Sequence, residues 1–389
     1  MWTGWYDGRL AGRASRGEEF DLAVATLPDE LWENGPAAVN HRIQELIDEH
    51  TPPEPIPAQG PGPHFALSPD LKIALAPPTD IDADGNNLGR IRQLLPLVRQ
   101  AAGDLAGHVS PNSQPEINRN LTQYREAIAA EPETIAWGTV FGLGVRLENA
   151  ATAARRDIAN RLQEPLEDAA QEALDSVLTL HGPLILATAE GKELSDQADQ
   201  FRLTREEQMA LREAALRVAD ALKNSDLADE PAAKLTEEAA ETIGERRHPE
   251  RGTAFGLATI KNAATLIIPA GIIGALHAGI DHLVGGGAAG LATGAAAAAM
   301  GGFALAEVEQ VRIATRALGA DVIRLVEIAK DQANLARAQA VARLRLLVPF
   351  RDFVTRNEQP LREIAEHSTQ MRWALRYIDF IVRTNGDRP

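Results

Sequence analysis

The chain has 389 residues, a net charge of −16 and no cysteine. The acidic balance argues against nucleic acid as a partner, and the lack of cysteine excludes disulfides, thiolate catalysis and cysteine-based zinc sites. Aromatic residues make up only 4% of the chain while alanine dominates long tracts, which favours helices packed through small side chains. We therefore expect a mainly α fold, a multi-helix bundle with long helices.

Residues 1–50 are expected to form a small N-terminal unit. The first residues lack a basic segment followed by an apolar run, so we expect no signal peptide. Two helix starts are predicted, at Pro28 and Pro36, because proline is favoured in the first turn of a helix. Five aromatic residues of this unit form either a compact core or an exposed recognition surface: Trp2, Trp5, Tyr6, Phe20 and Trp32.

Residues 51–86 are expected to connect this unit to the helices that follow. Thr51–Pro63 contains six prolines, which predicts a semi-rigid linker. Phe65–Leu75 reads as two brief strands around a Ser-Pro-Asp turn, so we predict a short β-hairpin. Asp80–Gly85 resembles the opening of an EF-hand loop, but Ile91 stands where a bidentate glutamate is needed. We interpret that segment as a polar turn.

Residues 87–261 are predicted to form an acidic helical domain, because the first 261 residues carry a net charge of −18. Thr204 and Glu207 form a capping-box pattern that opens one helix. Gly191-Lys192 lacks the glycine spacing and the Ser/Thr of a phosphate loop, and no other catalytic motif is present. We expect no enzymatic activity, no cofactor and no metal. Helical stripes of apolar residues run through Leu88, Ile91, Leu95 and Val98, and through Ile117, Leu121, Tyr124 and Ile128.

Residues 262–306 are the most informative part of the sequence, because Asp281 is their only formal charge. Two apolar limbs, 262–280 and 288–306, flank a glycine-rich turn. Each limb would form about 28 Å of helix at ~1.5 Å per residue, close to the ~30 Å hydrocarbon core of a bilayer. The stretch therefore predicts an apolar helical hairpin that is a candidate transmembrane element.

Small residues recur at helical spacing along both limbs. Such stripes let two helix backbones approach closely, which is how helices associate in lipid. We therefore predict that the hairpin inserts in a bilayer and self-associates through this glycine zipper. The predicted membrane and oligomer contacts are Ala270, Gly274, Ala278, Gly286, Gly290, Gly294, Ala298 and Gly302.

The alternative is that the hairpin is the buried core of a soluble bundle. The second limb has few large apolar residues and neither limb has flanking Trp or Tyr, which weakens the membrane signal. If the hairpin spans, Lys and Arg flank both of its ends and none lies in the turn, so the bulk would face the cytoplasm. His277, Asp281 and His282 lie around the turn, and we interpret them as solvated rather than as a proton sensor or metal site.

Residues 307–389 carry a net charge of +3. Val308–Val348 has no proline and an alanine-based heptad pattern, which predicts one long helix. A final helix is predicted from Pro360. Five arginines form a candidate lipid-facing basic cluster or, alternatively, an ordinary exposed face: Arg337, Arg343, Arg345, Arg351 and Arg356.

The sequence thus favours a non-enzymatic, helical, membrane-associated protein that could perturb or permeabilise a bilayer. Long helices that bracket an apolar hairpin also occur in α-helical pore-forming proteins, an analogy of layout alone. The alternative is a soluble, cytoplasmic helical scaffold whose acidic half binds protein partners.

Overall fold

A computed structural model describes residues 24–50, 55–77, 85–245, 249–285, 312–330 and 335–386. Over these residues the protein is mainly α-helical, as expected, with a two-stranded antiparallel sheet. The chain divides into two compact units, of which the larger comprises Ile56–Gly279 and Ala314–Pro389. The smaller comprises Met1–Pro55 and Ile280–Ile313. Most of the EF-hand-like segment, residues 80–84, lies outside the described residues.

The smaller unit contains helices α3 (Asp29–Glu33) and α4 (Pro36–His50). Gly35 joins them with a φ of +86°, a left-handed conformation that glycine adopts without steric cost. Val39 and Ile43 of α4 are buried, as their helical spacing predicts. Trp32 is 39% exposed, so it is not a core residue, and the other four aromatic residues of the predicted core lie outside the described residues.

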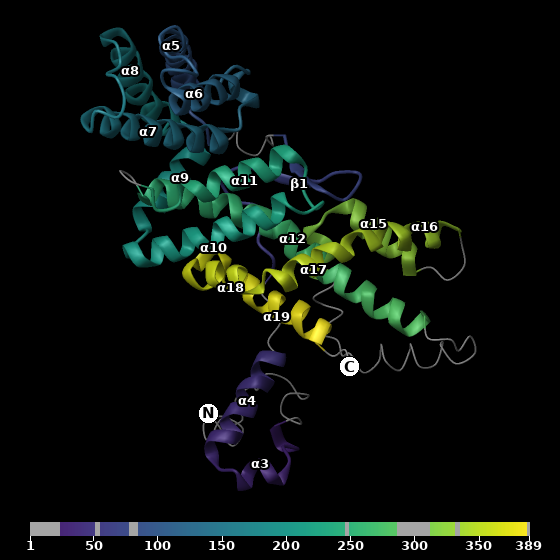
Figure 1. Ribbon diagram of the computed structural model, residues 1–389. Coiled ribbons are helices and arrows are strands. Elements are labelled where there is room, and N and C mark those ends of the chain that lie inside the picture. The colour runs from purple at the N-terminus through teal and green to yellow at the C-terminus, as the bar shows by residue number, and fades with distance from the viewer. Residues whose placement is uncertain are drawn as a thin grey trace. The chain divides into compact units, whose positions relative to one another are not determined.

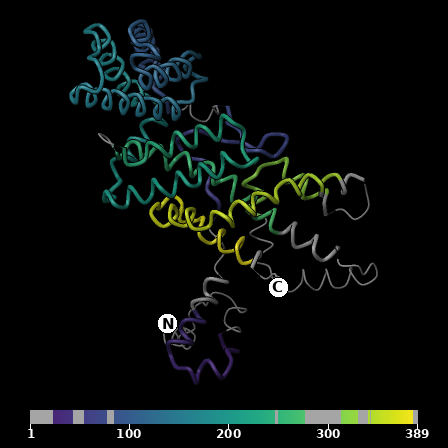
Figure 2. Tube along the Cα trace, viewed as in Figure 1, coloured from purple at the N-terminus to yellow at the C-terminus, as the bar shows by residue number. Residues whose placement is uncertain are grey.

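The larger unit opens with the predicted β-hairpin, β1 (Phe65–Leu67) and β2 (Ile73–Leu75), paired in antiparallel register. The turn is closed by the Ser68 N–H, which donates to the Lys72 carbonyl at 2.8 Å. Strand β2 also bonds to the segment before α11, because the Ile73 N–H donates to the Leu227 carbonyl at 2.7 Å. The hairpin therefore lies beside α11, as the traces in Figures 1 and 2 show.

Four helices pack together at the start of the larger unit (Figure 1): α5 with α6 and α8, and α7 with α6 and α8. Their apolar stripes are buried as predicted, which confirms the helical spacing of Ile91, Leu95 and Val98 and of Ile117 and Leu121. The bounds of the four helices are Leu88–Ala106 (α5), Pro115–Ala127 (α6), Trp137–Ala159 (α7) and Asp168–Ile185 (α8).

A second group of helices completes the larger unit, in which α10 packs against α11 and α18, and α19 packs against α17 and α18. The predicted capping box opens α10: the Thr204 N–H donates to Glu207 Oε2 at 2.7 Å, and the Glu207 N–H donates to Thr204 Oγ1 at 3.2 Å. The bounds of these helices are Ala189–Gln200 (α9), Arg205–Lys223 (α10), Glu230–Thr242 (α11), Val348–Arg356 (α17), Glu358–His367 (α18) and Trp373–Gly386 (α19).

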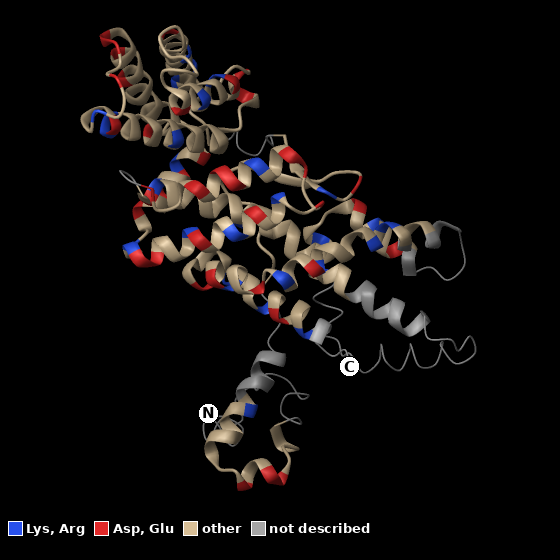
Figure 3. Ribbon diagram, in the orientation of Figure 1, with Lys and Arg blue, Asp and Glu red and all other residues tan. Residues whose placement is uncertain are grey.

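Helix α12 (Pro249–Gly285) carries the first apolar limb. Within the described residues, its part Pro249–Ala275 is one helix that is long and apolar enough to cross a membrane. However, 94% of its most apolar 18-residue window is buried inside the protein, as in the core helix of a soluble protein. Between Pro249 and Ala275 the charged residues are Glu250, Arg251 and Lys261, and the part of α12 that is coloured and in view in Figure 3 is largely tan. As far as Ala275, the first limb is therefore packed as core.

The prediction of one long helix over Val308–Val348 is wrong. Gly319 has a φ of +92°, which ends a helical segment because a left-handed residue cannot continue a right-handed helix. The chain then forms two helices, α15 (Ala320–Lys330) and α16 (Leu335–Leu344), which pack against each other. A 3₁₀ turn, η3 (Arg345–Leu347), leads into α17.

The single helix predicted from Pro360 is also wrong, because the chain is extended at Ser368 and forms a 3₁₀ turn before α19. Of the apolar positions expected on this helix, four are buried: Ile364 in α18, Met371 in the turn, and Ile378 and Ile381 in α19. Leu375 and Val382 are only partly buried.

Candidate functional site

Helix α7 has three glycines, each of which accommodates a side chain from a neighbouring element. We call these positions notches, because a Cβ atom on any of them would lie within 2.4 Å of that side chain. Glycine inside a helix costs about 1 kcal/mol relative to alanine, so close packing has to offset this cost. The three pairs are Gly138 with Glu190, Gly142 with Phe255, and Gly144 with His181.

Asn262 of α12 holds the proline-rich segment 59–64, which we call the strap. The Gly60 N–H donates to Asn262 Oδ1 at 2.9 Å, and Asn262 Nδ2 donates to the carbonyls of Gly60 at 3.0 Å and Pro63 at 3.1 Å. Asn262 itself is fully buried, and an unpaired amide there would be destabilising. The strap therefore belongs to the folded core rather than to a spacer.

The carboxylate of Glu190 joins the strap to α7 and α9. Its Oε1 accepts the Gly62 N–H at 2.7 Å, and its Oε2 accepts the Gly138 N–H at 2.7 Å. Glu190 is only 7% exposed and lies in the first turn of α9, while Gly138 lies in the first turn of α7. Both helix N-termini carry partial positive charge, which stabilises a buried carboxylate.

His181 of α8 occupies the notch at Gly144. A Cβ at Gly144 would lie 2.0 Å from His181 Nε2, so the ring rests directly on the α7 backbone. His181 Nδ1 is hydrogen-bonded to the Tyr124 hydroxyl at 2.9 Å, and the two rings meet edge-on with centroids 5.5 Å apart. Burial of the ring lowers the pKa of His181 to about 4, and the Arg251 cation acts in the same direction. The imidazole is therefore neutral near pH 7.

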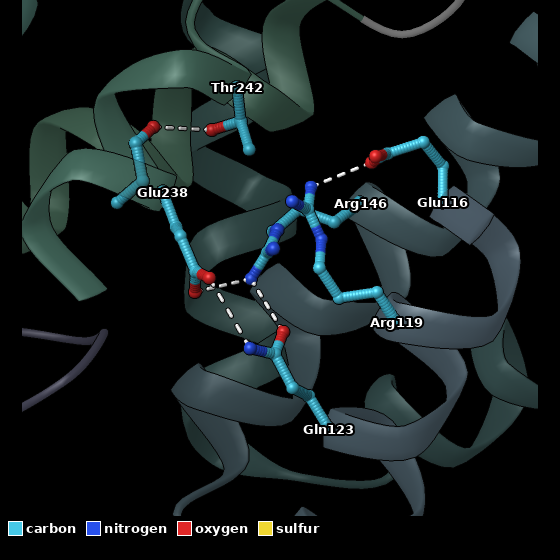
Figure 4. A network of polar contacts seen from close by, with 7 residues as sticks. Glu116, Arg119, Gln123, Arg146, Glu238 and Thr242 are labelled. Carbon is cyan, nitrogen blue, oxygen red and sulfur yellow. Dashed lines mark hydrogen bonds and ion pairs between the residues drawn. The ribbon is translucent and has the colours of Figure 1, made fainter. Parts of the chain in front are cut away.

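Arg146 of α7 forms a polar network with α6 and α11, shown in Figure 4. Its Nη1 donates to Glu238 Oε2 at 2.5 Å and to Gln123 Oε1 at 3.0 Å, while Gln123 Nε2 donates to Glu238 Oε1 at 3.3 Å. The side chains of Arg146 and Glu238 are 7% and 13% exposed. This ion pair is well shielded from water, so removal of one partner should lower the free energy of unfolding.

The carboxylate of Glu190, the amide of Asn262 and Nη1 of Arg146 each have hydrogen-bond partners within the protein. Among the described residues, no three His, Cys, Asp or Glu side chains lie close enough together to hold a metal ion. The arrangement is suited to fixing α12 against α7, the strap and α11. We refer to it as the α7–α12 junction.

The predicted hairpin contacts are only partly within the described residues. Ala270 is fully buried, and a Cβ on Gly274 would lie 2.3 Å from the Leu347 carbonyl oxygen. Gly274 thus lies against the backbone at the start of α17. The other predicted contacts lie outside the described residues: the side chain of Ala278, and all of Gly286, Gly290, Gly294, Ala298 and Gly302. Contact between the two limbs therefore remains a prediction.

The five predicted arginines do not share one environment. Arg351 is 7% exposed and pairs with Asp352 at 2.5 Å, so it cannot face lipid while the fold is intact. Arg343 is exposed and donates to the Pro69 carbonyl at 2.8 Å. Arg345 and Arg356 are exposed and line a cleft of about 660 Å³ together with both acidic and basic side chains. The side chain of Arg337 lies outside the described residues.

The sequence-based predictions did not include the α7–α12 junction, although the glycine spacing in α7 indicates it. Three glycines within seven residues of a predicted helix, Gly138, Gly142 and Gly144, indicate close approach of neighbouring groups. Asn262 and Glu190 left no comparable signal, because their partners lie far away in the chain. No protein-family model matches this chain, and no curated protein or solved structure matches it either.

Proposed function

We propose that this is a non-enzymatic, helical, membrane-associated protein whose apolar stretch works in two parts. The first part, Asn262–Ala275, is a stem that stays in the folded core. The second part, Leu276–Ala306, enters a bilayer. The observation that carries this division is the packing of the stem, which is buried and reaches Gly274, where a Cβ would lie 2.3 Å from the Leu347 carbonyl oxygen. The sequence from Leu276 to Ala306 then has Asp281 as its only formal charge.

The contacts of the stem support its retention in the protein. Withdrawal would break the three hydrogen bonds of Asn262. It would also remove Ile267, Ile268 and Ile272 from the core, where each is at most 2% exposed. Loss of one such buried side chain destabilises a folded unit by about 2–5 kcal/mol, a cost that insertion of the complete first limb would have to overcome.

Retention of the stem supports shallow insertion. Of the predicted first limb, 262–280, only residues 276–280 would remain to enter the bilayer. They would form about 8 Å of helix at ~1.5 Å per residue, far short of the ~30 Å hydrocarbon core. We propose that the hairpin enters one leaflet with both ends on the same side and with the bulk of the protein facing the cytoplasm. The stripe of Gly290, Gly294, Ala298 and Gly302 would then pack between copies of the chain in the bilayer.

The test uses single cysteines, because the chain has none of its own. An environment-sensitive fluorophore is attached at Leu291→Cys or Ala298→Cys, with Leu162→Cys, 77% exposed, as the control. With vesicles of phosphatidylcholine and phosphatidylglycerol, we expect a blue shift and quenching by lipid-soluble quenchers at positions 291 and 298 but not at 162. Unchanged emission at 291 and 298 would overturn the proposal.

The stem is tested separately by thiol reactivity of Leu266→Cys, which replaces a side chain that is 6% exposed. We expect slow reaction with maleimide, with and without vesicles. Rapid reaction on addition of vesicles would show that the stem leaves the core, and would refute the division into two parts while leaving membrane insertion intact.

A second candidate is a soluble helical interaction protein in which the whole apolar stretch is core. The burial of α12 favours this candidate. Gly290→Leu combined with Gly294→Leu separates the two, because close-packed backbones cannot accept two larger side chains without strain. Lipid-free thermal melting followed by circular dichroism should be unchanged under the membrane proposal and strongly destabilised under the alternative.

A further inference from the structure

We propose that His181 is an acid-responsive latch. Its ring holds α8 against α7, and its protonation weakens the packing of α12 against α7. The inference does not depend on membrane insertion, because the latch operates within the larger unit alone. It rests on where the ring lies, which charged groups face it and how α12 is attached to the same helix.

The position of the ring makes it structurally sensitive. His181 fills the notch at Gly144, where a Cβ would lie 2.0–2.7 Å from three of its ring atoms. On its other side it is hydrogen-bonded to the Tyr124 hydroxyl at 2.9 Å, and Tyr124 is fully buried in α6. The ring is part-buried and contacts both α7 and α6, so a charge on it acts on the packing of both helices.

The charged groups that face the ring oppose an imidazolium. From α12, Arg251 places a cation near the ring and lowers its pKa. From α7, Glu148 lies one turn after Gly144 and pairs with Arg251 at 3.8 Å. From α6, the Tyr124 hydroxyl stays neutral because burial raises its pKa. Protonation of His181 therefore adds a second positive charge beside that of Arg251.

The same groups connect the latch to α12. Arg251 lies in the first turn of α12, and one turn later Phe255 fills the notch at Gly142 of α7. The opposite faces of α7 thus hold His181 and Phe255 within one turn of each other. A shift of α7 away from α8 would disturb both the ion pair of Arg251 and the contact of Phe255.

The direction of the pH effect follows from the pKa values. An unfolded histidine has a pKa of about 6.5, whereas His181 has about 4 in the folded protein. Between these values the unfolded chain binds the extra proton, so stability is lost as the pH falls from 6.5 toward 4. His181 alone should raise the unfolding equilibrium constant up to about 20-fold between pH 7 and pH 5.

The first test compares urea unfolding at pH 7 and pH 5 for the parent, His181→Gln and the control His367→Gln. His367 is hydrogen-bonded to the Glu363 carbonyl at 2.8 Å, away from the notch. We expect the pH-dependent rise in the unfolding constant to be about 10- to 20-fold smaller in His181→Gln and unchanged in His367→Gln. An equal rise in all three proteins would overturn the proposal.

A second variant keeps the ring in place, in case His181→Gln does not fold. In Arg251→Gln the facing cation is removed, so NMR titration of the His181 ring should give a higher pKa than in the parent. Hydrogen exchange, corrected for its intrinsic pH dependence, should show α7, α8 and the first turns of α12 losing protection in the parent as the pH falls to 5. The loss should be smaller in Arg251→Gln. An unchanged pKa, or protection that is unaffected by pH in the parent, would contradict the latch.

Discussion

The ring of Phe255 occupies the space in which Gly142 would otherwise carry a side chain, since a Cβ there would lie 2.1 Å from Phe255 Cζ. Phe255 belongs to one continuous apolar core with Phe141 and Leu143, the neighbours of Gly142 in α7. This contact brings α12 as close to α7 as the ring allows. The position of α12 relative to α7 thus depends on Gly142, which has no side chain.

Gly142→Ala should destabilise the protein by about 1–3 kcal/mol, because the added methyl group overpacks the contact with Phe255. The matched control is Gly103→Ala in α5, where a Cβ would meet nothing within 4 Å. That change should stabilise the protein by about 0.5–1 kcal/mol, because glycine is unfavourable inside a helix. Urea unfolding at neutral pH measures both. Equal effects at the two positions would show that the notch is not tightly packed.

Glu238→Ala should destabilise the protein by about 3–5 kcal/mol, because it leaves the charge of the buried Arg146 without its carboxylate. The control is Glu133→Ala, which removes an exposed pair with Arg92 at 2.7 Å and should have little effect. Replacing both members of the buried pair, with Arg146→Met and Glu238→Leu, should recover most of the loss. If the double variant is no more stable than Glu238→Ala, the unpaired charge is not the cause.

Glu241→Gln should stabilise the protein at pH 7. Burial raises the pKa of this carboxyl group, and Glu237 and Glu238 act in the same direction. A raised pKa in the folded state means that stability is highest below the unfolded value, near 4.3, and is lost as the pH rises through the folded pKa. The gain from Glu241→Gln should therefore vanish below pH 4, whereas Glu237→Gln, which breaks a pair with Lys223 at 2.7 Å, should give no gain at pH 7. A gain that is independent of pH would refute this explanation.

Local patterns predicted the elements whose determinants are local. The apolar stripes of α5 and α6 and the alternation in Phe65–Leu75 were sufficient, because helix and strand periodicity directly reflect which face is buried. The long helix over Val308–Val348 failed at Gly319, whose sequence context is compatible with a helix interior although its φ is +92°. Glycine permits both conformations, so tertiary packing made the choice.

The candidate site was less predictable, because its contacts are non-local. The prolines of the strap indicated a spacer, and nothing near Gly60 or Pro63 in the sequence indicates a buried amide from α12. The sequence predicts an apolar helix for the first limb, but it does not distinguish a bilayer from a protein core, because both environments favour the same side chains. Only the neighbours of α12 reveal which of the two surrounds Asn262–Ala275.

The attachment of the strap to Asn262 also imposes an order on folding during synthesis. Gly60 and Asn262 are separated by 202 residues. At ~5–20 residues per second, the strap would leave the ribosome about 10–40 s before its partner has been made. The closure of the larger unit is therefore a late step that no N-terminal fragment can complete, and contacts of such separation slow folding of the whole chain as well.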